Sequence, residues 1–350
     1  MGRSEVVLKL AVAALFVSIV VVASASASGA PPKGGITSVP SSAPSAGATG
    51  NGHLILFQSL KPGGGDTLYT MRSDGSDVHR LPLKAPGSAI SPDWSPDGKR
   101  ITFAAQVGDS QSLWVARADG SNAHELFHCA GPCLSADYPA WSPDGRSIAF
   151  TYYNSKPPPT AGPPSGDSIR VIDLRSRKVR IVVRSTFPTL VDLARWSPDG
   201  RRFVVERDRF SSNGTETGCR IEIVQRSDGK VRPLTPYSRF GFHPDWSSTG
   251  NLITFDTYDL LAFGGPAPGA SNLFTIRPDG SHLRQLTFFK RDGNRVSAAT
   301  FTPDGKRIMF TYQVGTRRNA GIIASIGGAI RTVATKYSGP VTHPRLSPQR

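Results

Sequence analysis

Two aspartates and two histidines occupy matching positions in a sequence that repeats itself. Asp137 and Asp192 each lie four residues before a tryptophan of the repeat, and His243 and His343 each lie three residues before the equivalent large apolar residue. Carboxylates and imidazoles bind cations and polar ligands, and carboxylate oxygens suit calcium. The favoured interpretation is that these side chains satisfy backbone groups at strand ends, with no metal and no cofactor. A binding cluster that holds a cation such as calcium is the alternative.

No catalytic motif accompanies this cluster. The chain lacks a Gly-x-Ser-x-Gly nucleophile motif, a His-Glu-x-x-His zinc motif, a glycine-rich phosphate loop and a dinucleotide fingerprint. The sequence therefore favours a protein that is not an enzyme. An enzyme whose ionisable residues meet in one cavity is the alternative.

The cluster depends on a phrase that the chain repeats. In its full form the phrase is Trp-Ser-Pro-Asp-Gly, a tight turn in which Pro presets φ and Gly ends the turn without a Cβ clash. A segment of alternating apolar residues, typical of a strand, follows each copy. The copies span Trp94–Gly98, Trp141–Gly145, Trp196–Gly200, Trp246–Gly250 and Phe301–Gly305.

The spacing of the copies predicts the architecture. Their first residues lie 47, 55, 50 and 55 residues apart, and most units also contain an Asp-Gly hairpin signal. Four antiparallel strands per unit predict the blades of a β-propeller. In that fold the residues just before each phrase lie near one mouth of the central channel, where we expect the two aspartates and the two histidines.

The two ends of the chain share one further copy of the phrase. Leu346-Ser347-Pro348 matches its start, and Gly52–Phe57 matches the strand that follows it. We therefore predict an all-β fold, a six-bladed β-propeller of four-stranded antiparallel blades. Pairing of the N- and C-terminal strands closes the ring and leaves no free edge.

The five copies and the strands after them resemble the repeat of the TolB-like propeller family, a WD40-like repeat of the PD40 type. The resemblance covers the chain from residue 52 to its end. It implies an exported, non-enzymatic propeller that acts as a protein- or ligand-binding scaffold in the cell envelope. Because propellers host many functions, a carbohydrate-active lyase or hydrolase with its site in the channel mouth is the alternative.

Residues 1–27 are typical of a secretory signal peptide. Arg3 and Lys9 precede or flank an apolar run over residues 10–23, and small residues follow it. An N-terminal membrane anchor is the alternative. Residues 28–51 are mostly Gly, Ala, Ser, Pro and Thr, which predicts a disordered tether, and residues 52–350 form the propeller. Either leader predicts an extracytoplasmic protein that is secreted, periplasmic or attached to the cell envelope.

The chain has three cysteines. Cys129 and Cys133 bracket Ala-Gly-Pro, and we predict a local disulfide between them, with unpaired thiols as the alternative. Two thiols without further Cys or His ligands are too few for zinc. Cys219 has no predicted partner.

Three connections between predicted strands are long, at 152–167, 207–219 and 257–271. Long excursions on a rigid scaffold concentrate binding residues, although loop length also costs little and neutral insertions are the alternative. These connections carry the aromatic and Arg side chains that dominate protein interfaces. The candidate binding residues are Tyr152, Tyr153, Arg207, Arg209, Phe210, Tyr258 and Phe263.

The formal net charge of the chain is +15. Outside the cytoplasm a basic surface favours an anionic envelope polymer, a lipid headgroup or an acidic protein over nucleic acid. We expect a monomer whose partner is an envelope protein or an anionic envelope polymer, and no nucleic acid. A solvated surface without a partner is the alternative.

Overall fold

Each copy of the repeated phrase closes a tight turn between two strands in the computed structural model of the chain. In the first copy the Ser95 hydroxyl donates to Asp97 Oδ1 (2.6 Å) and accepts the Arg100 N–H (2.9 Å). Gly98 has a φ of 65°, in the left-handed region that favours glycine, and its N–H donates to the Ser95 carbonyl (2.8 Å). The turn is built from its own residues, which explains why the same residue types recur.

One copy departs from the phrase and keeps the contact through another residue. Trp246–Gly250 reads Trp-Ser-Ser-Thr-Gly and has no aspartate. The Ser247 hydroxyl donates instead to Asn251 Oδ1 (3.0 Å), and its oxygen accepts the Leu252 N–H (3.0 Å). The turn therefore needs an acceptor at this point rather than an aspartate as such.

The structure describes residues 52–61, 63–108, 110–154, 166–212, 216–257, 271–289, 294–333 and 337–348. They belong to a single compact unit that begins at Gly52. The predicted leader (1–27) and tether (28–51) lie outside the described residues. In the described ranges no helix is long and apolar enough to cross a membrane.

Strands make up nearly all of the regular structure, and one 3-10 turn, η1 (Tyr237–Arg239), accompanies them. The strands are β1 (Leu54–Leu60), β2 (Asp66–Arg72), β3 (His79–Arg80), β4 (Ala89–Trp94), β5 (Arg100–Val107), β6 (Ser110–Arg117), β7 (His124–Phe127), β8 (Ser135–Trp141), β9 (Ser147–Tyr153), β10 (Ser168–Asp173), β11 (Val179–Arg184), β12 (Thr189–Trp196), β13 (Arg202–Phe210), β14 (Glu216–Gln225), β15 (Val231–Pro233), β16 (Gly241–Trp246), β17 (Ile253–Thr257), β18 (Asn272–Ile276), β19 (Arg284–Gln285), β20 (Arg295–Phe301), β21 (Arg307–Val314), β22 (Arg317–Ala324), β23 (Arg331–Thr332) and β24 (Thr342–Leu346).

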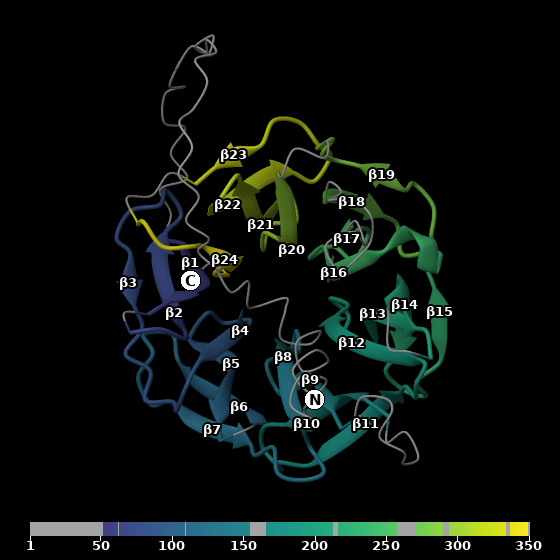
Figure 1. The fold of residues 1–350 in the computed structure, drawn as a ribbon, viewed down its shortest axis with the longest axis horizontal. Helices are drawn as coiled ribbons and strands as arrows, with labels where there is room; N and C mark the ends of the chain where they lie inside the picture. The colour runs from purple at the N-terminus through teal and green to yellow at the C-terminus, as the bar shows by residue number, and fades with distance from the viewer. Residues whose placement is uncertain are drawn as a thin grey trace, which may run out of the picture. The chain divides into compact units, whose positions relative to one another are not determined.

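Antiparallel four-stranded sheets are the building unit of the fold. The orders β24-β1-β2-β3, β12-β13-β14-β15, β16-β17-β18-β19 and β20-β21-β22-β23 form four separate sheets. Strands β4 to β11 form one eight-stranded sheet, in which a single parallel bridge between Gln111 and Ser135 joins β6 to β8. The sheets stand around a common centre, with β4, β8, β12, β16, β20 and β24 innermost (Figure 1). The prediction of an all-β fold of four-stranded antiparallel sheets is confirmed.

The two ends of the described chain meet in one sheet. Strand β24 pairs antiparallel with β1, with Leu346 opposite Ile55. The Leu54 N–H donates to Ser347 Oγ (2.9 Å), and the Trp94 indole of the next sheet donates to the Arg345 carbonyl (3.2 Å). The divided phrase is therefore restored across the chain ends, as the sequence predicts.

The hydrophobic core lies between neighbouring sheets. The first residue of each complete phrase is buried. The strand that follows each phrase contains a fully buried phenylalanine, at one matching position in five strands and two residues earlier, at Phe203, in the sixth. In one such cluster, Leu56 and Leu68 of the first sheet pack with Trp94, Ile101 and Phe103 of the second. Each sheet is therefore stabilised by the apolar side chains that it buries against the neighbouring sheet on either face.

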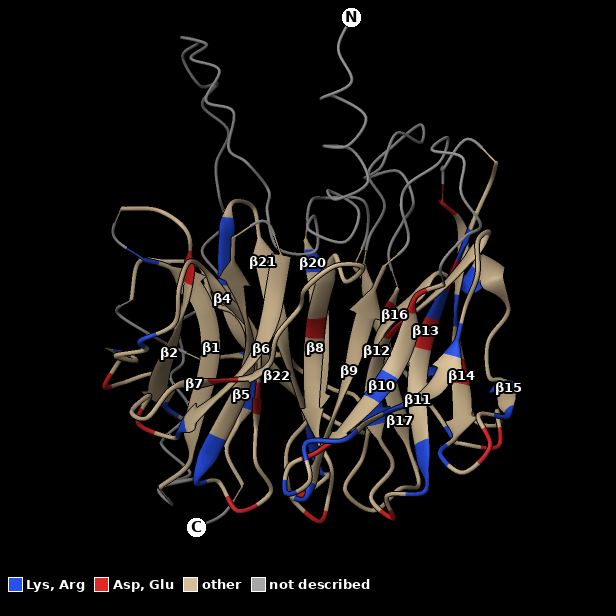
Figure 2. Ribbon diagram, turned by 90° about the horizontal axis from the view of Figure 1, so that it is seen from below, with Lys and Arg blue, Asp and Glu red and all other residues tan. Residues whose placement is uncertain are grey.

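The sheets present two rims, and one of them carries mixed charge. We call the rim that carries the phrase turns the turn face, and the opposite rim, where β9, β13 and β17 end, the loop face. Acidic and basic residues alternate along the turn face, at the lower edge in Figure 2. The mixture follows from the phrase, which places an aspartate in the turn and cations after it.

Candidate functional site

Every innermost strand contains one residue with a left-handed backbone, three positions before the phrase. Such a conformation costs a non-glycine residue about 1–3 kcal/mol, so six occurrences mark a requirement of the fold. The register with the following strand shifts at this point in each case. The six residues line the central channel, and their φ values are Ser91 51°, Tyr138 49°, Leu193 51°, His243 48°, Ala298 54° and His343 50°.

The shifted register removes the N–H of this residue from the ladder, and a side chain of the preceding sheet accepts it. The His343 N–H donates to Thr311 Oγ1 (3.0 Å), and the His243 N–H donates to Glu206 Oε2 (2.9 Å). Both acceptors directly follow the apolar residues of their strand, which are 308–310 before Thr311 and 203–205 before Glu206. The same contact recurs in the pairs Leu193–Thr151 (3.1 Å) and Ser91–Gln58 (3.3 Å).

The two aspartates predicted from the sequence serve the same backbone positions. The residue that would accept the Tyr138 N–H is Ala104, which cannot, and Asp137 Oδ1 accepts it instead (2.6 Å). Asp192 Oδ1 accepts the N–H of the next residue (2.6 Å) and the Thr151 hydroxyl (2.7 Å). Burial raises the pKa of Asp137 to about 7, and the nearby Asp192 carboxyl adds to the rise. These contacts are those expected when the aspartates satisfy backbone groups at strand ends.

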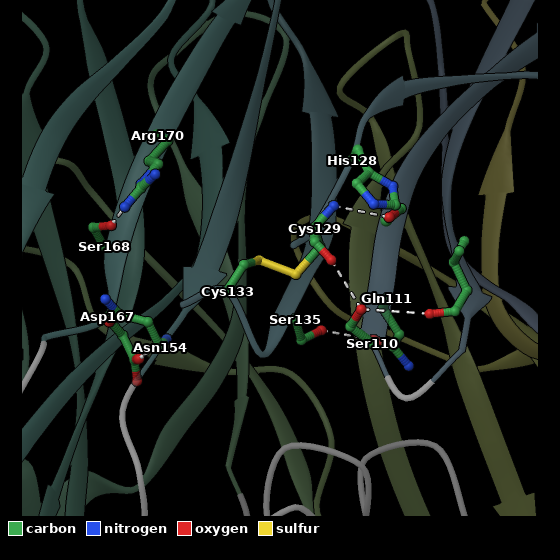
Figure 3. The surroundings of a disulfide bond; sticks show 12 residues. Ser110, Gln111, His128, Cys129, Cys133, Ser135, Asn154, Asp167, Ser168 and Arg170 are labelled. Carbon is green, nitrogen blue, oxygen red and sulfur yellow. Dashed lines mark hydrogen bonds between the residues drawn. A yellow bond between two sulfur atoms is a disulfide. The ribbon is translucent and has the colours of Figure 1, made fainter. Parts of the chain in front are cut away.

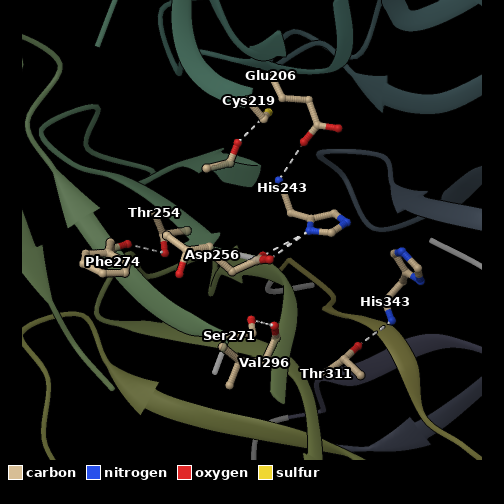
Figure 4. A network of polar contacts seen from close by, with 12 residues as sticks. Glu206, Cys219, His243, Thr254, Asp256, Ser271, Phe274, Val296, Thr311 and His343 are labelled. Carbon is tan, nitrogen blue, oxygen red and sulfur yellow. Dashed lines mark hydrogen bonds and ion pairs between the residues drawn. The ribbon is translucent and has the colours of Figure 1, made fainter. Parts of the chain in front are cut away.

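The two histidines face each other across the channel with ring centroids 6.3 Å apart (Figure 4). His243 Nδ1 lies 3.1 Å from the Asp256 carboxylate, which orients this ring. Neither ring nitrogen of His343 has a hydrogen-bond partner among the described residues. Burial lowers the pKa of His343 to about 3. The structure therefore places the two histidines on the lining of the channel, where His343 is neutral, and the two aspartates on the innermost strands beside it.

A second layer of charged residues, which the sequence reasoning missed, lies one position before the phrases. It contains Asp93, Arg195, Asp245 and Arg345, so two cations alternate with two anions around the channel. Asp93 Oδ1 lies 3.6 Å from Arg345 Nε, and Asp93 Oδ2 accepts the Trp141 N–H (2.9 Å). The signal for this layer was available in the sequence as charged residues at one matching position of four units.

These contacts link neighbouring innermost strands. Asp245 Oδ2 accepts the Phe301 N–H (2.8 Å), which repeats the Asp93 contact in another pair of sheets. Arg195 donates to the Pro139 carbonyl (3.3 Å). Burial lowers the pKa of Arg195 to about 10, and the like charge of Arg345 adds to the effect. The charged layer thus holds the strands together around the channel.

The channel has little free space at this level. The cavity between the innermost strands has a volume of about 10 Å³ for the centre of a water molecule, room for about one water. Among the described residues no group of three or more His, Cys, Asp or Glu is arranged to hold a metal ion. The expectation of no cofactor, with a channel cation such as calcium as the alternative, stays a prediction.

Three of the predicted binding residues are buried, and the prediction of an exposed loop position for them is wrong. Tyr152 and Tyr153 belong to β9, and Arg207 belongs to β13, with exposed fractions of 5%, 9% and 8%. Arg207 Nε lies 2.6 Å from Glu222 Oε2. The predicted loop at 207–219 is mostly strand, because β13 continues to Phe210 and β14 begins at Glu216.

The remaining loop residues have different outcomes. Arg209 is exposed and Phe210 is partly exposed at the end of β13. Tyr258 and Phe263 lie outside the described residues. The error for the buried three arises because the strands on the loop face extend further than their turn signals indicate.

The loop face instead presents a cluster around Tyr237, which the sequence reasoning missed. The Arg209 and Arg220 guanidinium groups lie 4.6 Å and 4.3 Å from the centroid of the Tyr237 ring. Tyr237 stands in η1, and Gly218 of β14 leaves room for it, since a Cβ there would lie 2.8 Å from Tyr237 Cβ. We call Arg209, Arg220 and Tyr237 the Tyr237 cluster. All three are at least partly exposed, and cation–π contacts of this kind stabilise by about 0.5–1 kcal/mol each.

Comparison with known proteins agrees with this architecture. The family model described as the TolB beta propeller domain, PD40, matches residues 105–349. The chain belongs to the TolB β-propeller family. The family resemblance drawn from the repeated phrase is confirmed.

Individual TolB relatives share only part of the chain. The Tol-Pal system protein TolB of Anaeromyxobacter dehalogenans is 33% identical over 82 residues, which cover 21% of this chain and 19% of that protein. The match therefore spans about a fifth of the relative. The crystal structure of TolB from Acinetobacter baumannii has a TM-score of 0.63 at 19% identity, covering 86% of this chain and 69% of that chain.

The same fold occurs in proteins of other activities. Kuenenia stuttgartiensis hydrazine synthase matches with a TM-score of 0.64 at 12% identity, covering 86% of this chain and 48% of that chain. At this level of identity the similarity shows the propeller fold alone. Function in this TolB-family chain has to be argued from its own residues.

Two cysteines of this TolB-family propeller form a disulfide on the approach to β8. Cys129 and Cys133 are joined, with Cα atoms 5.3 Å apart (Figure 3). The Ser110 hydroxyl donates to the Cys129 carbonyl (2.9 Å), and the Cys129 N–H donates to Ser112 Oγ (3.0 Å). The third thiol, Cys219, is buried and donates to the Gly241 carbonyl (2.9 Å). The bridge closes a short loop between β7 and β8, and the two hydrogen bonds hold this loop against β6, which suits a structural role.

Proposed function

We propose that this chain is an extracytoplasmic, non-enzymatic, TolB-like scaffold that binds an envelope protein through its loop face. The scaffold is a six-bladed propeller. Strands β4 to β7 and β8 to β11 count as two blades, because only one bridge joins them. The blade of β24, β1, β2 and β3 closes the ring. Residues 1–27 direct export or anchor the chain, and residues 28–51 tether the propeller.

The observation that carries the proposal is the Tyr237 cluster. Tyrosine and arginine dominate the energetics of protein interfaces, particularly where they are already held in place. Arg220 is held by its ion pair with Glu222 (2.6 Å) and by the Tyr237 ring. Phe210 and Phe240 are partly exposed on the same rim. The cluster thus offers a preorganised aromatic and cationic surface, which lowers the entropy cost of binding.

The relatives support an envelope partner. The name of the Anaeromyxobacter protein places that protein in the Tol-Pal system. The predicted leader of this chain supports a location outside the cytoplasm. A protein partner also fits the many aromatic and Arg residues of the loop face better than a purely anionic polymer does.

A catalytic role in the channel finds little support. The oxygens of Asp137 and Asp192 already accept backbone and hydroxyl hydrogens. The cavity has room for about one water molecule, far less than a sugar ring needs. A lyase or hydrolase site would require these groups to be released and the channel to widen.

Affinity capture from a cell-envelope extract tests the proposal. We expect the wild-type chain to capture one specific protein and Tyr237→Ala to lose at least tenfold in affinity for it. Arg226→Ala is the matched control, because it removes a guanidinium contact with the Trp196 ring (5.1 Å) on the turn face. A partner retained in full by Tyr237→Ala and lost by Arg226→Ala would overturn the assignment to the loop face.

A further inference from the structure

The outer edge of one sheet carries an unusual excess of positive charge. Between Asp173 and Asp192 the chain has no acidic residue and five basic ones, which lie in β11 and in the connection before it. Four of them are exposed and have no side-chain hydrogen bond or ion pair in the described part of the chain. We call these four the basic rim: Arg175, Lys178, Arg180 and Arg184.

The charge of the basic rim is not neutralised by its surroundings. Desolvation lowers the pKa of Arg180, and the like charge of Arg226 from the next sheet lowers it further. The nearest turn carboxylate, Asp173, accepts the backbone N–H groups of Arg175 (3.1 Å) and Ser176 (2.7 Å). Asp173 also attracts Arg175, but this single carboxylate offsets only part of the charge of the four cations. An external anion is therefore the available counter-charge.

Aliphatic side chains are exposed among these cations. Val179 and Ile181 of β11 are 37% and 36% exposed, and Val231 of β15 is 39% exposed. The two strands lie on the outer rim of neighbouring sheets (Figure 1), and a Cβ added at Gly229 would lie 2.5 Å from the Val182 carbonyl. The turn before β15 therefore packs on β11. Successive side chains of β11 point to opposite faces of the sheet, so Val179 and Ile181 alternate with Arg180 along one exposed outer edge.

We propose that this surface binds an anionic lipid bilayer. Cations attract anionic headgroups, and short aliphatic side chains enter the boundary between headgroups and acyl chains. A hydrated polyanion would use the cations alone and would leave Val179 and Ile181 in water. The combination on one edge therefore favours a lipid surface. The site is separate from the Tyr237 cluster, so the proposal does not depend on the protein partner.

Vesicle co-sedimentation of the full chain tests the proposal. The probes are vesicles of phosphatidylglycerol and phosphatidylcholine in equal parts, and vesicles of phosphatidylcholine alone. We expect binding to the anionic vesicles that weakens with added salt. Each cation near an anionic surface is worth about fivefold in partitioning. Changing all four residues of the basic rim to Gln should therefore lower binding by more than tenfold.

A charge-matched control separates the basic rim from net charge. Changing Arg117, Lys306, Arg317 and Arg331 to Gln removes three Arg and one Lys that lie outside strands β8 to β11, and the leader is unchanged in both variants. We expect this control to bind within about threefold of the wild type, since distant charges are screened. Equal losses in the two variants, or no loss in the basic-rim variant, would overturn the proposal.

A second pair of variants distinguishes a bilayer from a soluble polyanion. Val179→Thr together with Ile181→Thr keeps the β-branched shape and the charge of β11. We expect this double variant to bind the anionic vesicles several-fold more weakly and to bind polyglutamate as the wild type does. Two results together would contradict a lipid ligand: unchanged vesicle binding by the double variant, and polyglutamate binding that is lost when the basic rim is changed to Gln. The ligand would then be an acidic polymer.

Discussion

The two rims of the propeller both place arginine over aromatic rings, but they do so for different reasons. On the turn face, Arg100 lies 4.5 Å from the Trp141 ring and Arg202 lies 5.2 Å from the Trp246 ring. Both arginines follow a phrase by the same two residues, so the contact recurs because the sequence does. On the loop face, Tyr237 and its arginines occupy positions without counterparts in the other units.

This difference separates the requirements of the fold from those of function. A contact that returns in several sheets is explained by the repeat, since each unit must satisfy the same backbone groups and fill the same space. A contact that occurs once has no such explanation. We therefore expect mutations in the repeated set to act on stability, and mutations in the Tyr237 cluster to act on binding.

The largest expected effect concerns the closure of the ring. Deleting residues 341–350 removes β24, which pairs with β1, and removes the buried Val341. The deletion leaves β1 as an unpaired edge strand, which promotes aggregation. We expect insoluble protein or complete loss of the cooperative unfolding transition, measured by circular dichroism. Deleting residues 28–50 is the control and should leave the melting curve unchanged; equal behaviour of the two deletions would contradict shared-sheet closure.

The next effect compares the two kinds of aromatic residue directly. Trp196 is buried against Phe203, with ring centroids 4.3 Å apart. Trp196→Ala should lower the free energy of unfolding by about 3–5 kcal/mol. Tyr237→Ala removes a partly exposed ring with two cation–π contacts and should lower it by about 1–2 kcal/mol. Denaturant unfolding measures both, and similar losses would mean that the Tyr237 cluster serves the fold.

Asp137 should make stability depend on pH. Its pKa is about 7 when folded, against 3.8 ordinarily, so between about pH 4 and pH 7 the folded state holds a proton that the unfolded state has lost. The contribution of this carboxyl therefore destabilises the protein progressively as the pH rises through that window, and is constant above it. Asp137→Asn keeps the acceptor for the Tyr138 N–H and cannot ionise.

We expect Asp137→Asn to be more stable than the wild type at pH 8 by up to about 4 kcal/mol, and equally stable at pH 4. Unfolding by denaturant at the two pH values gives the difference in stability between the variant and the wild type. Contributions of other buried acids such as Asp192 that both proteins share cancel in this difference. A gain of the same size at both pH values would show that ionisation of this carboxyl is not the cause.

The smallest effect concerns the side chain that accepts the N–H of one left-handed residue on an innermost strand. Thr311 Oγ1 accepts the His343 N–H (3.0 Å), and both residues are buried. Thr311→Val leaves this donor unsatisfied and should cost about 1–3 kcal/mol. Thr311→Ser retains the hydroxyl and should cost less. Thermal unfolding compares them, and equal losses would assign the effect to the methyl group rather than to the hydrogen bond.

The repeated phrase was enough to predict the all-β fold, the four-stranded sheets and the meeting of the chain ends. Its turn is closed by hydrogen bonds within about five residues, as in Ser95 to Arg100, and the apolar alternation is equally local. Interactions between residues this close along the chain can be predicted from a single sequence. The matching positions of His243 and His343 likewise predicted a place near the channel, and both residues line it.

The burial and partners of individual side chains depended on segments far apart in the chain. The sequence predicts loop positions for Tyr152 and Tyr153, yet β9 continues through both because β8 pairs with both and β10 pairs with Tyr152. Both side chains are buried. The Tyr237 cluster exists because η1 packs on β14, where Gly218 leaves space. Turn chemistry is local, whereas exposure is set by whichever distant sheet lies against a side chain, and that information emerges when the ring is assembled.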